Sequence, residues 1–557
     1  MRVPSNDRDA MARSYKEYLP PHDLWPDLVF TLPEFNYPAT LNVASELLDV
    51  HVAEGHGEDA AVLFEDQRIS YAELQRMTNR IGHAFLRIGV GPGDRVALRL
   101  PNRPVFVAAW LAIQKIGAVG VATMPMLRAR EIAYIANDCR VSVFLCAADL
   151  LDELIRARAT FDHPVIVVAA PAPPLPAGAD YTLDELAAAT HDELDAYPTR
   201  RDDLALIAYT SGSTGVPKGT THSPTDILAA ADGYARTVLR PARHDIFSGH
   251  PTMAFTFGLG GLLVFPFRAG AATVLMDRFS PELLLTTVAR RRATLLFCAA
   301  TTYRMLLQDA SFEHTYDLSS LRLCVSAGET LPAIVFKEWY RRTGVEILDG
   351  LGATEMFHIF ISARAGSVRP GATGTPVPGY EAKVVDDQFS EVPRGTPGLL
   401  AVRGPTGCRY WRKPELQREY VRHGWNVTGD LYCQDSDGYF WYQCRNDDLI
   451  ICGGFNIAGP EVESVMLEHP AVVEAAVVAS PDPVRGAVPK AFVVLRPDVE
   501  AGNDLVVALQ DHVKRELAPY KYPREIEFVA ALPKTETGKI RRAELRQREV
   551  ERKAAVP

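Results

Sequence analysis

The chain has 557 residues, of which 47% are hydrophobic, and its formal net charge is −10 at neutral pH. This length exceeds what one hydrophobic core usually organises, so at least two domains are expected. The acidic balance argues against general binding of nucleic acid. Because the N-terminus lacks the apolar core of a signal peptide and no stretch is apolar for long enough to span a bilayer, we expect a cytoplasmic protein that does not bind membranes.

Apolar strand candidates alternate with helical patterns from residue 94 onwards. The pattern begins with a strand over residues 95–100, a helix over 105–116 and a strand over 141–147. The same alternation resumes over residues 293–300, 301–308, 321–326, 332–342 and 345–348. Such alternation is typical of an α/β protein.

The pattern changes in the last third of the chain. Short β-like runs between residues 380 and 402 predict a small β subdomain. Beyond residue 446, a helix over 461–468, strands near Ala475 and Val493 and a helix over 505–517 predict a compact α+β domain. The expected fold is therefore a large N-terminal α/β domain with a small β subdomain, followed by an α+β C-terminal domain.

A glycine-rich loop follows a short apolar run over residues 204–209, which predicts a parallel strand buried on both faces. Its glycines permit backbone conformations closed to other residues, its hydroxyls can donate hydrogen bonds, and its lysine can bring positive charge to a polyphosphate. The loop does not match a P-loop NTPase, because Pro217 and Gly219 flank the lysine where that motif needs Gly and Ser or Thr. The candidate phosphate-binding residues are Thr210, Ser211, Ser213, Thr214 and Lys218.

Later motifs carry further side chains suited to a nucleotide. The motif Asp349-Gly-Leu-Gly-Ala-Thr-Glu355 ends in Thr354, which can donate to a phosphate oxygen, and Glu355, a hard carboxylate ligand for Mg²⁺. Asp430 ends the motif Trp-Asn-Val-Thr-Gly-Asp and can accept hydrogen bonds from two ribose hydroxyls. Arg445 can brace the same sugar or a neighbouring phosphate.

In this order, and followed by Pro533-Lys-Thr-Glu-Thr-Gly-Lys539, these motifs resemble those of the adenylate-forming superfamily. Acyl-CoA synthetases, adenylation domains that load carrier proteins, and luciferases belong to it, and the resemblance covers nearly the whole chain. It implies an N-terminal domain over residues 1–446 that holds ATP and the acyl group, and a mobile C-terminal domain over residues 447–557. It also implies that ATP contacts Gly328, Glu329 and Asp349.

The resemblance gives roles to two residues of the C-terminal domain. The residue that corresponds to Asp447 is a hinge, about which the domain rotates between two catalytic conformations. Lys539 corresponds to a catalytic cation that can hold the carboxylate near the α-phosphorus and stabilise negative charge as pyrophosphate leaves. Thioester formation needs that cation to withdraw, so that a thiol can approach the acyl carbonyl.

Residues 253–260 and 355–360 resemble the acyl-pocket stretches of the benzoate–CoA ligase branch, especially its 2-aminobenzoate–CoA ligases. An aryl carboxylate is the implied substrate. Phe257 and Ile359 could stack against a flat ring, Gly352 leaves room for it, and His358 could hydrogen-bond the carboxylate or an ortho substituent. Flat apolar walls do not by themselves exclude a medium-chain fatty acid. The remaining wall candidates are Thr256, Thr302 and Tyr303.

CoA is the expected acyl acceptor, because no carrier-protein segment is appended to the chain. Gly453 and Gly454 would permit close approach of the pantetheine arm, and Arg485, Lys521 or Arg524 could meet the CoA phosphates. The chain departs from the family at Cys444, Cys452 and Tyr522. An enzyme that loads a separate carrier protein and a non-catalytic scaffold remain alternatives, and either a monomer or a homodimer fits the sequence.

Overall fold

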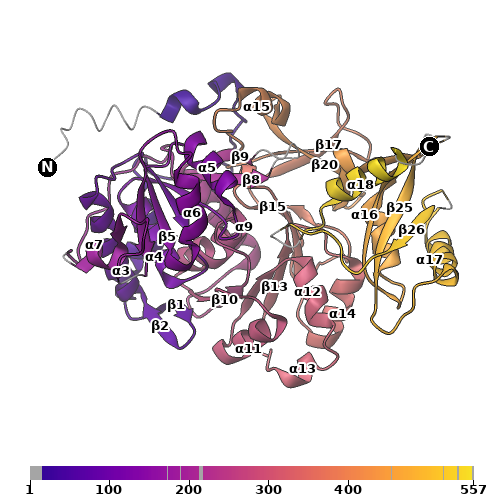
Figure 1. Ribbon diagram of the computed structural model, residues 1–557, viewed down its shortest axis with the longest axis horizontal. Helices are drawn as coiled ribbons and strands as arrows, with labels where there is room; N and C mark the ends of the chain where they lie inside the picture. Colours follow the sequence, from indigo (N-terminus) through magenta and orange to yellow (C-terminus); the bar gives the residue numbers. More distant parts are fainter. Residues whose placement is uncertain are drawn as a thin grey trace.

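The computed structural model describes residues 15–171, 174–188, 190–211, 217–452, 455–483, 485–518, 520–535 and 539–554. Figure 1 shows two large sheets with helices around them, a smaller sheet beside them, and a separate group of strands and helices formed by the C-terminal end of the chain. The predicted fold class, a large α/β domain followed by a smaller α+β domain, is confirmed.

The first large sheet has seven strands, of which only the edge strand β9 runs antiparallel to its neighbour. The strand predicted over residues 95–100 is β3, the strand predicted over 141–147 is β5, and the helix between them is α4 (Pro104–Lys115). The strand order is β7 (Tyr181–Thr182), β6 (Ile166–Ala170), β5 (Val143–Ala147), β3 (Arg95–Arg99), β4 (Val119–Ala122), β8 (Leu206–Ser211) and β9 (Pro217–His222).

The second large sheet has nine strands with a parallel centre and antiparallel edges. Its order is β16 (Thr375–Pro376), β15 (Ile359–Ser362), β14 (Ile347–Gly352), β13 (Leu323–Ala327), β12 (Leu295–Cys298), β10 (Ile246–Gly249), β11 (Ala272–Leu275), β1 (Ala60–Phe64) and β2 (Gln67–Ser70). Strands close in space therefore come from distant parts of the chain, since β1 pairs with β11.

Helices cover both sheets and create separate hydrophobic cores on the two faces. Successive residues of a strand point to opposite faces. Along β12, Leu295 and Phe297 accordingly join the central core, whereas Leu296 and Cys298 join an outer core. Helix α3 begins at a capping box in which Ser70 and Glu73 satisfy each other's backbone N–H groups. The helices are α3 (Tyr71–Arg87), α5 (Ala129–Asp138), α6 (Leu151–Arg158), α7 (Leu183–Ala188), α8 (Pro224–Ala230), α9 (Thr256–Leu259), α10 (Phe265–Arg268), α11 (Pro281–Arg291), α12 (Ala300–Leu307), α13 (Phe312–Thr315) and α14 (Ala333–Thr343).

Two smaller sheets complete the molecule. The first contains β17 (Glu381–Val385), β18 (Gly398–Arg403), β19 (Val421–Arg422), β20 (Trp425–Gln434) and β21 (Phe440–Arg445). The second contains β22 (Leu449–Cys452), β23 (Phe455–Ala458), β24 (Val472–Asp482), β25 (Gly486–Leu495) and β26 (Glu525–Phe528), with helices α16 (Gly459–Met466), α17 (Asn503–Glu516) and α18 (Arg542–Ala554). The C-terminal sheet has its own core, whose buried members all lie beyond residue 449.

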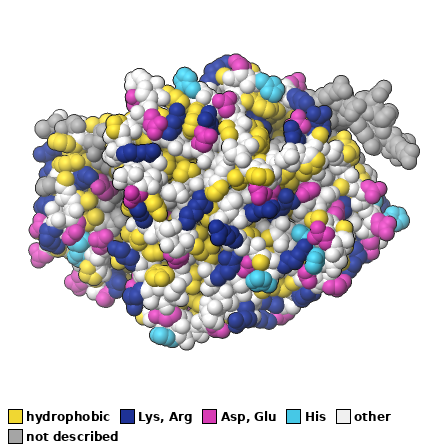
Figure 2. All heavy atoms as spheres, turned by 180° about the vertical axis from the view of Figure 1, so that it is seen from behind, with side chains coloured by type: hydrophobic (Ala, Val, Ile, Leu, Met, Phe, Trp, Pro, Cys, Tyr) yellow, Lys and Arg dark blue, Asp and Glu magenta, His cyan; other side chains and the backbone are white. Residues whose placement is uncertain are grey.

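The surface mixes charges of both signs. Lys and Arg side chains are interspersed with Asp and Glu side chains over the face shown in Figure 2. Within the part of the chain that the structure describes, no helix combines the length and the apolar character needed to cross a membrane.

Candidate active site

Several predicted ligand-binding residues follow the carboxyl ends of parallel strands. Gly328 and Glu329 come directly after β13, and the 3₁₀ turn η8 (Thr354–Met356) follows the neighbouring strand β14. Helix α12, which carries Thr302, begins two residues after β12. Because parallel strands end at the same edge of a sheet, the loops that follow them meet there and form ligand sites.

The glycine-rich loop connects β8 to β9 at the edge of the first sheet. Thr210 lies opposite Lys218 in the antiparallel pair that these strands form. Ser213 and Thr214 lie outside the described residues, as does the side chain of Ser211. The phosphate-binding roles proposed for these residues remain predictions.

Lys218 and Glu355 both lie close to Tyr410, Lys218 at its ring and Glu355 at its hydroxyl. The Lys218 ammonium lies 5.8 Å from the centroid of the Tyr410 ring. The Tyr410 hydroxyl donates to Oε1 of Glu355 at 2.7 Å. A single carboxylate can hold Mg²⁺ when phosphate oxygens and water complete its coordination. The structure thus brings a candidate metal ligand, Glu355, close to a candidate phosphate ligand, Lys218, although the sequence separates them by more than a hundred residues.

Asp430 and Arg445 face each other across the β20–β21 pair. Arg445 Nη1 donates to Oδ1 of Asp430 at 3.1 Å and to the backbone oxygen of Thr428 at 3.3 Å. Burial raises the pKa of Asp430 above its ordinary value, and the Arg445 guanidinium opposes this shift. The arginine thereby holds in place the carboxylate proposed to meet the ribose hydroxyls.

Asp349 of β14 and Glu329, which follows β13, differ in their hydrogen bonding. Oδ1 of Asp349 is buried and has no hydrogen-bond partner among the described residues. Burial raises the pKa of Asp349 to about 8, and the charge of Glu329 adds to this shift. The Glu329 carboxylate instead accepts hydrogen bonds from the backbone N–H and the hydroxyl of Thr301. Of the two side chains, Asp349 is the one with a buried oxygen that has no partner among the described residues.

Lys539 reaches this group of residues from the C-terminal end of the chain. A Cβ placed on Gly328, whose φ of +90° is unfavourable for other residues, would lie 3.2 Å from Cε and 3.6 Å from Nζ of Lys539. Lys539 is exposed as a residue. Protein atoms around its ammonium nevertheless desolvate this group and lower its pKa. Negative charge on Glu329, Asp430 and Glu355 acts in the opposite direction. The predicted cation therefore lies among the predicted ATP ligands.

His358 lies among aromatic side chains beside η8. Its Nε2 is 3.3 Å from the backbone oxygen of Phe257, and its ring centroid lies 4.4 Å from that of Phe265 and 5.6 Å from that of Phe257. Because Nε2 donates its proton to that carbonyl, Nδ1 is left as an acceptor. Nδ1 is buried and has no partner among the described residues. Burial lowers the pKa of His358 to about 3, so the imidazole is neutral.

The other predicted acyl-wall residues do not all lie beside His358. Ile359 belongs to the same core as His358's neighbour Phe257. A Cβ on Gly352 would lie 2.8 Å from the backbone of His358, so the close approach of β14 and β15 already requires a glycine here. Thr256 is a buried residue of α9, the short helix that also carries Phe257.

Tyr303 lies on the far face of the second sheet. Its hydroxyl lies within hydrogen-bond distance of the backbone oxygens of Leu296 and Val325, at 3.1 and 3.0 Å, and its ring meets Trp339 edge-on in the outer core. Adjacent residues of a helix point about 100° apart, so Thr302 and Tyr303 face different surroundings. Thr302 contacts Nε2 of His250 at 2.6 Å. The structure does not bring Tyr303 to the aromatic side chains around His358.

Comparison with known proteins identifies the family of the chain. The family model for AMP-binding enzymes matches residues 50–411, and the model for the C-terminal domain of these enzymes matches residues 461–539. The chain belongs to the AMP-binding enzyme family. It is 37% identical to the benzoate–CoA ligase of Thauera aromatica over 93% of this chain and 98% of that protein.

Two solved structures are similar to the whole enzyme. The anthranilate–CoA ligase AuaEII, solved in complex with anthranoyl-AMP, has a TM-score of 0.89 and 35% sequence identity, and the match covers 94% of this chain and 100% of that one. A benzoate–CoA ligase from Burkholderia xenovorans LB400 has a TM-score of 0.83 and 32% identity, and the match covers 91% of this chain and 99% of that one. The sequence-based assignment to the benzoate–CoA ligase branch of adenylate-forming enzymes is therefore confirmed.

The residues proposed to bind CoA differ in their surroundings. Lys521 is paired with Glu461 at 2.6 Å, and the guanidinium of Arg524 lies 4.1 Å from the centroid of the Tyr522 ring. Arg485 is exposed. Gly453 and Gly454 lie outside the described residues. The CoA-binding roles remain predictions for the enzyme.

Sequence reasoning missed Tyr410 as a neighbour of Glu355, and it also missed Phe265 and Phe297 as aromatic neighbours of His358 and Phe257. The Phe297 ring centroid lies 5.8 Å from that of Phe257, with the two rings tilted, and Phe265 meets His358 edge-on. A lone aromatic residue in an apolar run looks the same whether it lines a pocket or a core. The short segment around Tyr410 carries no motif that marks it as a neighbour of Glu355.

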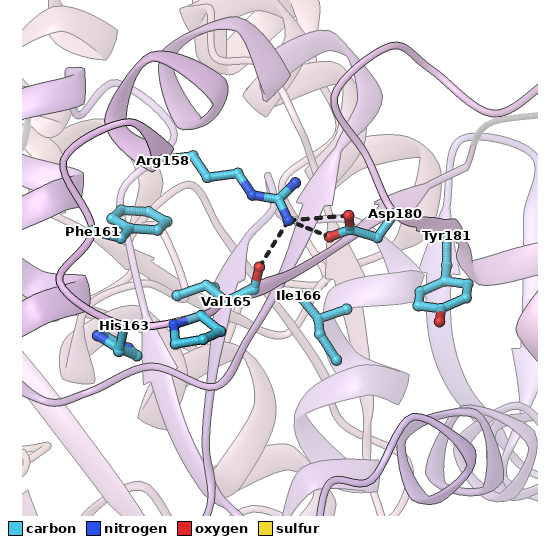
Figure 3. Close-up of a pocket in the computed structure, with 8 residues that line it drawn as sticks. Arg158, Phe161, His163, Val165, Ile166, Asp180 and Tyr181 are labelled. Atoms are coloured by element: carbon cyan, nitrogen blue, oxygen red, sulfur yellow. Dashed lines mark hydrogen bonds and ion pairs between the residues drawn. The ribbon is translucent and has the colours of Figure 1, made fainter.

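A surface recess also lies at the opposite edge of the first sheet from the glycine-rich loop. Figure 3 shows Arg158 of α6 with its guanidinium directed at Asp180. Arg158 Nη2 donates to both carboxylate oxygens of Asp180, at 3.0 and 2.8 Å, and to the backbone oxygen of Val165 at 3.1 Å. His163 is likewise engaged, with Nε2 lying 2.8 Å from the backbone oxygen of Val141. These contacts tie β6 and β7 to α6 and give the recess a structural role.

Proposed function

We propose that the enzyme uses ATP to convert a benzoate-type acid into an acyl-adenylate and then transfers the acyl group to CoA. In the first step a carboxylate oxygen attacks the α-phosphorus and pyrophosphate leaves. In the second step the CoA thiolate attacks the acyl carbonyl and AMP leaves, so the products are aryl-CoA, AMP and pyrophosphate. The observation that carries this proposal is the position of Lys539 against Gly328, among Glu329, Asp430 and Glu355.

Each charged group has a distinct task in this proposal. The Lys539 ammonium attracts the substrate carboxylate and the α-phosphate, and it offsets the negative charge that grows as pyrophosphate departs. Glu355 would hold Mg²⁺, which neutralises the phosphate oxygens, while Thr354 and Lys218 donate to those oxygens. Asp430, braced by Arg445, accepts from the ribose. Asp349 offers its unpartnered oxygen to a donor on the nucleotide.

The acyl pocket favours a ring with a donor group at the ortho position. Phe257, Phe265 and Phe297 provide flat apolar surface beside His358. A neutral imidazole whose free nitrogen is an acceptor pairs with an N–H or O–H group, and it repels a carboxylate oxygen. This chemistry supports 2-aminobenzoate as substrate, with its carboxylate directed at Lys539 in the proposed complex. The similarity to the anthranilate–CoA ligase points the same way.

A substrate panel tests the proposal. Benzoate, 2-aminobenzoate, salicylate and hexanoate are each incubated with the enzyme, ATP, Mg²⁺ and CoA, and acyl-CoA and pyrophosphate are measured. We expect acid-dependent pyrophosphate release and aryl-CoA formation, with 2-aminobenzoate the preferred acid. If no acid promoted pyrophosphate release, adenylate formation would be refuted, and efficient use of hexanoate would refute the aryl pocket.

Two narrower alternatives are distinguished by the same assay. An enzyme that loads a separate carrier protein would release pyrophosphate with the correct acid but form its thioester on the carrier rather than on CoA. A medium-chain acyl-CoA ligase would prefer hexanoate. A flexible chain loses several torsional freedoms on entering a flat slot, which a rigid ring does not, and this favours the aryl acid.

A further inference from the structure

Tyr410 belongs to a segment that pairs alongside β9, the strand that follows the glycine-rich loop. Thr220 of β9 and Tyr410 form an antiparallel bridge. On either side of this bridge, the Trp411 N–H donates to the backbone oxygen of Gly219 at 2.8 Å, and the Thr221 N–H donates to that of Arg409 at 3.0 Å. The backbone of Tyr410 is therefore tied in register to the strand that carries Lys218.

The same segment is held from its other side by Gln417, a residue of α15 (Pro414–Tyr420) that is fully buried. Its Oε1 accepts from the Tyr410 N–H at 2.9 Å, and its Nε2 donates to the backbone oxygens of Cys408 and Leu24 at 2.8 and 3.0 Å. With hydrogen bonds on both sides, the Tyr410 backbone has little freedom, and its side chain is only 1% exposed. The position of the phenol is thus set before any ligand arrives.

The phenol acts on one oxygen of Glu355. Its hydroxyl donates to Oε1 at 2.7 Å, which leaves Oε2 for other partners. The ammonium of Lys218 lies over the Tyr410 ring, 5.8 Å from the ring centroid.

We propose that Tyr410 is a positioning residue that orients the Glu355 carboxylate for Mg²⁺ and couples it to the strand of the glycine-rich loop. This inference rests on the proposed function, because it assumes that the enzyme uses Mg²⁺ with ATP. A carboxylate held by a rigid donor binds a cation without first losing rotational freedom, whereas a free carboxylate must be ordered when the cation binds. Tyr410 touches neither substrate nor metal in this role.

The substitution Tyr410→Phe tests the inference, since it removes one oxygen atom and keeps the ring. We expect the Mg²⁺ concentration for half-maximal ATP–pyrophosphate exchange to rise about tenfold, as for loss of a hydrogen bond to a charged group. The rate at saturating Mg²⁺ should stay near that of the unaltered enzyme. A purely structural role would lower that rate and the melting temperature instead, without moving the Mg²⁺ midpoint.

Tyr420→Phe is the matched control. The Tyr420 ring lies 5.7 Å from that of Tyr410, in the same buried group near Glu355, but its hydroxyl has no hydrogen-bond partner among the described residues. We expect its Mg²⁺ midpoint to be unchanged. An equal shift in both variants would overturn the inference, because it would show a general effect of phenol loss.

A double-substitution cycle with Glu355→Gln tests whether the effect of Tyr410 on Mg²⁺ passes through Glu355. If Tyr410 acts through Glu355, Tyr410→Phe should have no further effect on the Mg²⁺ midpoint in the Glu355→Gln background. Additive shifts would overturn the inference. Binding of ATP at a series of Mg²⁺ concentrations gives the same comparison if exchange in the double variant is too slow to measure. Absence of Mg²⁺-dependent exchange in the unaltered enzyme would instead refute the proposed function.

Discussion

His358 has one buried acceptor atom, Nδ1, without a partner among the described residues, and in the proposed function this atom sets which ring substituents the enzyme favours. Its Nε2 is committed to the backbone oxygen of Phe257, and its low pKa keeps the ring neutral through the physiological range. We predict that His358→Ala lowers the ratio of catalytic efficiencies for 2-aminobenzoate over 2-fluorobenzoate by about tenfold, the value for one hydrogen bond of about 1.4 kcal/mol. Steady-state kinetics with both acids measures this ratio. An equal loss for both acids would place His358 in the supporting core.

Asp349 should make stability depend on pH. Its folded-state pKa of about 8 lies above its ordinary value of 3.8, so between these values the folded protein holds a proton that the unfolded chain releases. The free energy of unfolding therefore falls as pH rises through this window, by about 1.4 kcal/mol per pH unit at most. We predict that Asp349→Asn raises the melting temperature of the ligand-free enzyme more at pH 8 than at pH 5. A difference that stays constant with pH would contradict the assignment.

At the scale of elements, the turn η9 (Asn446–Asp448) joins the two domains proposed from the sequence. It connects β21 of the small β sheet to β22 of the C-terminal sheet. Asp448 is paired with Arg546 of α18, so the end of this turn is already fastened to the C-terminal domain. Rotation between the domains would then have to occur at the residues before Asp448.

The hinge proposal makes Asp447→Pro informative. Proline fixes φ near −65° and should hinder rotation without removing any ATP ligand. We predict that acid-dependent pyrophosphate release is retained while conversion of the acyl-adenylate to the thioester slows by about tenfold or more, as expected when a conformational step becomes limiting. Rapid-quench measurements of the two steps provide the comparison. Full turnover by this variant would exclude residue 447 as the hinge.

At the scale of the whole molecule, the proposed site forms only where the C-terminal part meets the N-terminal sheets. Lys539 lies against Gly328, two hundred residues earlier in the chain, while Lys534 of the same segment is paired with Glu474 of its own domain at 2.5 Å. The two lysines offer a matched pair, because only one reaches the candidate active site.

Substituting these lysines separates the two half-reactions. We predict that Lys539→Ala slows adenylate formation by about a hundredfold or more, since a charge that stabilises the transition state is lost. Thioester formation from preformed acyl-adenylate and CoA should be spared, and Lys534→Ala should leave both steps unchanged. Equal loss of both half-reactions in Lys539→Ala would refute a role confined to adenylation.

The sequence by itself determined the fold class and the family. Alternating apolar runs predict strands such as β3 and β5 because burial on both faces of a sheet demands them. The ordered motifs from the glycine-rich loop to Lys539 point to a nucleotide because each carries groups suited to phosphate, metal or ribose. The acyl-wall roles remain predictions, and the structure brings only some of these residues together. Phe257 and His358 lie together as expected, whereas Tyr303 belongs to the outer core.

Only the tertiary structure decided the contacts between residues far apart in the chain. It paired Tyr410 with Glu355, brought Lys539 against Gly328, and engaged Nε2 of His358, which leaves Nδ1 without a partner among the described residues. The direction of each side chain depends on strand register and on which helix turn faces the sheet, and a motif does not encode either. Residue types therefore predicted the chemistry of this enzyme, and the way its strands and domains meet determined which atoms can perform it.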